Sequence, residues 1–221
     1  MVLSMFRKSP GGLEHVVSKA VGMLGDARHS FDLATLALLT DTSASSVDAD
    51  IRATDERMNE TEIELRSELV VHISVQGAMD IGSVLGLMLL INKIERIGDQ
   101  AKNVLDLAEA GAVLSDQPDS EALLAERSEI SALFGEVAEL MMEPDDARFD
   151  ELNQRCDQLQ ASHQEKIMGY LRSDEPGRTV VPRAIYYRYL KRIVANLDGI
   201  VRAASEPVGI EPSPPVTDLD E

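Results

Sequence analysis

One stripe of residues, spaced alternately three and four positions apart, runs from position 48 to position 72 of the chain. This spacing places side chains on one face of an α-helix and is typical of the buried seam of a helical bundle. The stripe reads Asp48, Ile51, Asp55, Met58, Glu62, Leu65, Leu69 and His72. Its first half therefore alternates apolar residues with carboxylates. Burying unpaired carboxylates is costly, so something must compensate these acids, and a bound cation is the simplest candidate.

The composition favours a helical protein. The 221 residues are 44% hydrophobic but only 4% aromatic, and no tryptophan is present, a composition typical of helical bundles. No useful length of chain alternates polar and apolar residues as a strand would. We predict helices over residues 13–40, 47–75, 78–110, 121–142, 146–172 and 182–205. Gly22 and Gly25 weaken the first of these and leave a break there open, Gly111 is a typical residue after a helix end, and Pro182 suits a first helical turn.

An internal repeat divides the predicted helices into two sets of three. Shifting the stripe by 98 positions gives Asp146, Phe149, Asn153, Cys156, Gln160, His163, Ile167 and Tyr170 at the same spacing. The sequence thus predicts an all-α chain of two diverged three-helix units. We expect an N-terminal extension (1–12), a first repeat (13–112), a linker (113–120), a second repeat (121–205) and a disordered acidic, proline-rich tail (206–221).

Two more acids join the three of the stripe. Glu95 and Asp99 lie four positions apart on the predicted third helix and therefore face the same side. The candidate metal ligands are Asp48, Asp55, Glu62, Glu95 and Asp99. An all-oxygen set of this kind suits a hard cation such as Mg²⁺, Ca²⁺, Mn²⁺ or iron. The alternative is a solvated acidic face whose ion-pair partners are Arg52, Arg57, Arg66 and Arg96.

The second repeat has lost most of this charge. Asn153 and Gln160 replace Asp55 and Glu62, and Lys191 and Ala195 stand at the positions of Glu95 and Asp99. We therefore predict one metal site, in the first repeat, and a metal-free counterpart in the second. In that counterpart Lys191 would supply the positive charge beside Asp146 or its neighbours.

The stretch from Ile94 to Asn103 reads Ile-Glu-Arg-Ile-Gly-Asp-Gln-Ala-Lys-Asn and resembles the signature of the PhoU family, roughly Leu-Glu-Arg-Ile-Gly-Asp-His-Ala-x-Asn-Ile. The resemblance implies two tandem three-helix bundles and a metal held through acidic E/D-x-x-x-D motifs, which Glu95 and Asp99 match. It also implies a regulator of phosphate uptake that acts beside a phosphate ABC transporter and a phosphate-sensing histidine kinase. The second repeat departs from the signature where Lys191 and Ala195 replace the acidic pair.

Charge, cysteine content and the absence of certain motifs exclude several classes of function. A net charge of −18 argues against nucleic acid as a partner. The single cysteine, the lack of a visible secretory signal and the short longest apolar run (84–91) indicate a cytoplasmic protein without membrane insertion. No nucleophile–base pattern appears, so we expect no enzyme. A homodimer, a metal-free helical adaptor and a carboxylate-bridged dimetal enzyme remain alternatives; the last is disfavoured because Glu68 and His72 lack the usual Glu-x-x-His spacing.

Further side chains in the sequence have the chemistry of ligands. His72 and His163 are expected to be core histidines with a hydrogen-bond partner, and Cys156 a small core residue. On the first predicted helix, the spacing of Asp26, His29 and Asp32 is compatible with completing a metal shell. The last predicted helix carries a basic group, which is expected to lie on an ordinary bundle face rather than receive a phosphate. This basic group is Arg183, Arg188, Lys191 and Arg192.

Overall fold

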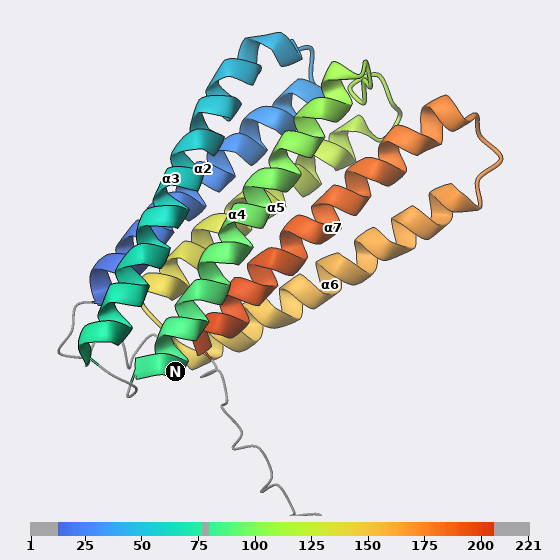
Figure 1. Ribbon diagram of the computed structural model, residues 1–221. Coiled ribbons are helices and arrows are strands. Elements are labelled where there is room, and N and C mark those ends of the chain that lie inside the picture. The colour runs from blue at the N-terminus through green and yellow to red at the C-terminus, as the bar shows by residue number, and fades with distance from the viewer. Residues whose placement is uncertain (1–12, 77–79, 206–221) are drawn as a thin grey trace, which may run out of the picture.

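The computed structural model describes residues 13–76 and 80–205, and in these ranges the chain forms six α-helices and no strand (Figure 1). The helices are α2 (Leu13–Leu39), α3 (Ala44–Gln76), α4 (Ile81–Glu109), α5 (Ser120–Met142), α6 (Asp146–Leu171) and α7 (Gly177–Ser205). The predicted all-α class is confirmed. The predicted N-terminal extension, the disordered tail and Gly77 of the predicted turn at Gln76-Gly77 lie outside the described residues.

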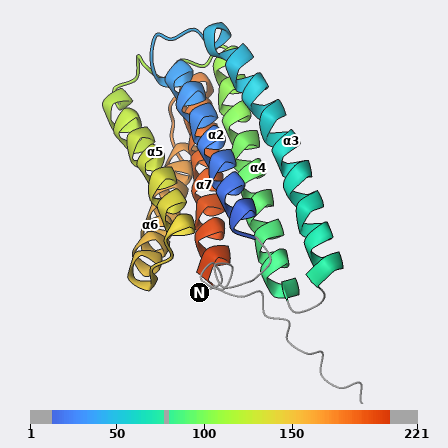
Figure 2. The ribbon, with the colours of Figure 1, turned by 90° about the vertical axis from the view of Figure 1, so that its left-hand side faces the viewer.

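Two three-helix bundles stand side by side (Figures 1 and 2), as the repeat and the family resemblance predicted. Helices α2, α3 and α4 form the first bundle, and α5, α6 and α7 form the second. Helix α4 packs along α7, and α5 contacts α2 more extensively than it contacts either helix of its own bundle. Phe31 of α2 stacks on Phe134 of α5 with ring centroids 5.6 Å apart. The two bundles therefore share one continuous apolar core.

Local sequence explains where several helices begin and end. Gly111 follows α4 with a φ of 87°, a left-handed conformation that glycine adopts without steric cost. The amide of Ala112 donates to the carbonyl of Leu107 at 3.2 Å, and that of Gly111 donates to Ala108 at 3.0 Å, which is the hydrogen-bond pattern of a Schellman cap. At the start of α6 the Asp145 carboxylate accepts from the amide of Arg148 at 2.8 Å.

One helix start was predicted wrongly, and the structure answers the open question of a break in the first helix. The last helix begins at Gly177 rather than at Pro182, so the proline lies inside α7. It is tolerated there because it removes a single early backbone hydrogen bond, the one to Arg178, a residue at an exposed position. Helix α2 continues unbroken through Gly22 and Gly25, since Ala20, Met23, Leu24 and Ala27 around them are buried and packing outweighs the glycines' weak helix propensity.

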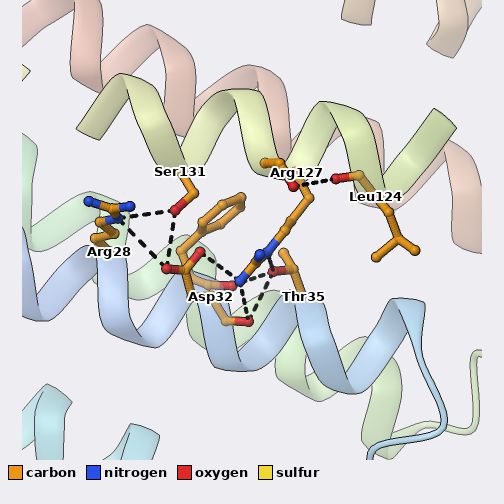
Figure 3. Close-up of polar contacts among 8 residues, drawn as sticks. Arg28, Asp32, Thr35, Leu124, Arg127 and Ser131 are labelled. Atoms are coloured by element: carbon orange, nitrogen blue, oxygen red, sulfur yellow. Dashed lines mark hydrogen bonds and ion pairs between the residues drawn. The ribbon is translucent and has the colours of Figure 1, made fainter. Parts of the chain in front are cut away.

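A polar network joins the two bundles where α2 meets α5 (Figure 3). An Arg127 Nη atom lies 2.9 Å from Oδ1 of Asp32, and the Ser131 hydroxyl donates to Oδ2 of Asp32 at 3.1 Å. Arg28 Nε donates to the Ser131 hydroxyl at 3.0 Å. Asp32 therefore faces α5 and not α4. This position contradicts the suggestion that Asp32 completes a metal shell with the acids of α3 and α4.

Among the described helices, none contains a stretch long and apolar enough to cross a membrane.

Candidate metal centre between α3 and α4

The stripe on α3 separates into buried apolar members and half-buried acids. Ile51, Met58, Leu65 and Leu69 are at most 2% exposed. The side chains of the three acids retain exposed fractions of 31% (Asp48), 24% (Asp55) and 14% (Glu62). They therefore lie along the edge of the seam rather than in its centre. This placement lowers the cost of keeping them charged, because water still reaches each carboxylate.

A lysine connects the acids of the two helices. Lys102 of α4 places its Nζ 2.8 Å from Oδ1 of Asp55 on α3 and 3.1 Å from Oδ1 of Asp99, one turn back on α4. Burial alone would lower the pKa of Lys102, but its hydrogen bonds to Asp55 and Asp99 outweigh burial and raise it. The ammonium group therefore stays charged and compensates both carboxylates.

Burial and the neighbouring acids both act on Glu95. Burial, followed by the charges of Asp99 and Glu62, raises the pKa of Glu95 from 4.5 to about 7, although Lys102 acts in the opposite direction. The negative charges of Glu62 and Asp99 both act on Glu95, so the three carboxylates lie close to one another. A cation added among them would be favoured.

A glycine allows the two helices to approach closely at this point. A Cβ atom at Gly98 would lie 2.9 Å from Cε of Met58, closer than carbon atoms can pack without displacement. Met58 lies between Asp55 and Glu62 in the α3 stripe, and Gly98 directly precedes Asp99. The absence of a side chain at Gly98 thus brings the acidic edges of α3 and α4 together.

On α3, two of the predicted ligands also have a basic partner on the same helix. An Arg66 Nη atom lies 2.7 Å from Glu62, and Arg52 Nε lies 2.6 Å from Asp48. Asp48 precedes Asp55 by two helical turns, about 10 Å along the axis at about 1.5 Å per residue. Glu62 follows Asp55 by the same separation. The structure therefore links Asp55 to Asp99 through Lys102 and places Glu95 near Asp99 and Glu62, while Asp48 lies at the end of the row.

The five predicted ligands are all carboxylates, and carboxylate oxygens are the ligands that hard cations prefer. As the side chains lie, however, no three acidic, histidine or cysteine residues within 13–76 and 80–205 converge closely enough to hold one ion. Lys102 stands between Asp55 and Asp99. The five ligands thus remain a prediction, and a shared ion would require Lys102 to move.

The counterpart in the second bundle differs from the expectation for Lys191. Its Nζ donates to Oε1 of Gln164 on α6 at 2.8 Å. Asp146 is exposed at the first turn of α6, roughly 27 Å from Gln164 along the helix axis at about 1.5 Å per residue. Lys191 therefore does not lie beside Asp146, because the part of α6 that it contacts is about five helical turns from that residue. Its partner is the neutral amide of Gln164.

The second bundle holds a second charged cluster, which was not predicted from the sequence. Glu126 of α5 lies 2.8 Å from Nε2 of the fully buried His163, and it accepts from Nζ of Lys166 at 2.9 Å. Lys166 also donates to the Tyr187 hydroxyl at 3.0 Å. Burial alone would raise the pKa of Glu126, but the contacts with His163 and Lys166 prevail and lower it to about 2. The available signal was Glu126 itself, an acid between Leu123 and Ile130 in the seam of α5.

Several of the remaining candidates have internal partners, while Arg188 and Arg192 lie at exposed positions. His72 Nε2 lies 3.0 Å from Asp80, and Glu68 accepts from Lys19 at 2.8 Å. On α2, Asp26 pairs with Arg57, and His29 lies near Asp50. Arg183 is buried and donates to Gln117 and Asp119. Cys156 is fully buried, and burial raises the pKa of its thiol to about 12, as expected of a small core residue.

Comparison with known proteins identifies relatives of this chain. Residues 21–108, which include all five predicted ligands, match the sequence model of the PhoU domain. The crystal structure of PhoU from Pseudomonas aeruginosa has the same fold, with a TM-score of 0.75 and 18% sequence identity, over 87% of this chain and 94% of that one. No curated protein matches the chain.

Proposed function

We propose that this chain, whose residues 21–108 match the PhoU domain, is a metal-binding regulator of phosphate uptake and phosphate signalling that acts through contacts with other proteins in the cytoplasm. The observation that carries the proposal is the match of the PhoU domain to residues 21–108, the part of the chain that holds the α3–α4 acids. Membership in a regulatory family agrees with the expectation that the chain is not an enzyme.

The metal part of the proposal depends on four carboxylates. Asp55, Glu62, Glu95 and Asp99 would supply oxygen ligands to a hard cation, and Asp48 would be the most distant of the predicted ligands. When bound, such an ion would neutralise the clustered negative charge and hold α3 and α4 together. The raised pKa of Glu95 supports this interpretation, because the charges of Asp99 and Glu62 add to the effect of burial.

The proposed partners are a phosphate ABC transporter, a phosphate-sensing histidine kinase, or both. Their identity is tested by affinity purification of the full chain from its own cells under phosphate-replete conditions, followed by mass spectrometry. We expect components of phosphate transport or phosphate sensing to be enriched over a control purification with an unrelated helical bundle. Recovery of none of these components would reject the regulatory assignment.

A metal-free adaptor is the second candidate, and one observation favours it. Arg52, Arg66 and Lys102 pair with Asp48, Glu62 and Asp55, so each acid of the α3 stripe already has a basic partner. Metal analysis of protein purified without chelator separates the two candidates. The adaptor requires that no metal co-purifies and that added divalent cations leave the melting temperature unchanged.

A further inference from the structure

Lys102 differs from the other basic partners of the acidic group. Arg52 and Arg66 extend from α3 to an acid of their own helix, four positions away. Lys102 instead connects the two helices, because its Nζ contacts Asp55 on α3 and Asp99 on α4. It occupies the position between two carboxylates that a bridging cation would need. One ammonium group thus provides the link that the proposed function assigns to a metal ion.

The two cations cannot use these oxygens together. Nζ lies 2.8 Å from Asp55 and 3.1 Å from Asp99, so an ion bound to the same oxygens would overlap the ammonium group. A divalent ion nearby would also repel the positive charge of Lys102. The Lys102 ammonium group can move into solvent, because its side chain is 32% exposed and its four-carbon stem is flexible.

We propose that Lys102 is the resident cation of the α3–α4 acids, and that a divalent metal ion binds there only as the Lys102 ammonium group leaves Asp55 and Asp99. This inference rests on the proposed function, because it concerns the same carboxylates. Two consequences follow. The metal-free protein keeps α3 and α4 together through Lys102, and the lysine weakens metal affinity by competing for two of the ligands.

The test is a titration of the full chain with Mn²⁺ by isothermal titration calorimetry. Lys102→Gln removes the competing charge and keeps a side chain of similar length. We expect it to bind Mn²⁺ about tenfold more tightly than the unmodified chain, which corresponds to about 1.4 kcal/mol. The matched control is Lys19→Gln, because Lys19 also bridges two carboxylates, Glu64 at 2.6 Å and Glu68 at 2.8 Å, but lies outside the acidic group. This control should change the affinity by less than twofold.

A second measurement follows the same variants without metal. In excess chelator, Lys102→Gln should melt at a lower temperature than the unmodified chain, since Asp55 and Asp99 then repel each other without compensation, and Mn²⁺ should restore the loss. Equal Mn²⁺ affinity in the unmodified chain and Lys102→Gln would refute the proposal that the metal displaces Lys102, but it would not contradict the metal site itself. Absence of Mn²⁺ binding in both would reject the metal part of the proposed function, and the displacement with it.

Discussion

The buried cluster around Glu126 should make a large, pH-dependent contribution to stability. Its side chain is only 10% exposed and contacts both His163 and Lys166. The pKa of Glu126 falls from 4.5 to about 2 in the folded chain. Because each pKa unit is worth about 1.4 kcal/mol, this difference corresponds to about 3 kcal/mol of stability at pH 7. Glu126→Gln keeps the shape and one acceptor oxygen but removes the charge, so it should lose about this amount.

The sign of the pH dependence follows from the lowered pKa. The stabilisation is fully present above the unfolded-state value of 4.5 and is lost as the pH falls through the folded-state value of about 2. The gap between the unmodified chain and Glu126→Gln should therefore shrink from about 3 kcal/mol at pH 7 to about 1.4 kcal/mol at pH 3. Urea unfolding followed by circular dichroism at both pH values measures this gap.

A gap that is equally large at pH 7 and pH 3 would refute the reasoning, because it would show that the loss comes from packing and not from charge. A loss below about 1 kcal/mol at pH 7 would also refute it, since that is the range of exposed ion pairs.

Further changes test the helix contacts. Gly98→Ala should lower the free energy of unfolding by about 1 kcal/mol, because its Cβ would meet Met58 Cε at 2.9 Å. Gly22→Ala, where a Cβ meets no atom within 4 Å, should instead stabilise the chain by about 0.5–1 kcal/mol in the same urea assay; equal effects of both changes would contradict the close approach. Arg127→Ala should cost about 1–2 kcal/mol by removing one of the partners of Asp32, at 2.9 Å, while Ser131 remains. An unchanged urea midpoint would show that this contact between the bundles contributes nothing.

The helices were largely predictable because their signals are local. Apolar periodicity located all six, and Gly111 marked the end of α4 through the positive φ that glycine favours. The misplaced start of α7 has a different origin. Proline rules treat Pro182 as a first-turn residue, but packing of buried Val180 and Arg183 extends the helix back to Gly177.

The candidate site was predictable only in part, because side-chain directions are not a property of spacing. The positions of Glu95 and Asp99 followed from the helical period, and Arg52 and Arg66 were named as partners of the acids. Lys102, three positions after Asp99, was missed because its contact with Asp55 depends on how α4 lies against α3. Glu126 was missed for the same reason, since its partners come from α6.

The most direct test of the metal-binding claim is the number and location of divalent sites in the full chain. Equilibrium dialysis with Mn²⁺ should find one site of high affinity, which Asp99→Asn weakens strongly. The exchange Asp198→Asn, at a carboxylate on α7 that pairs with Arg202, should leave that site intact. Two sites of equal affinity, or full binding by Asp99→Asn, would contradict a single metal centre between α3 and α4.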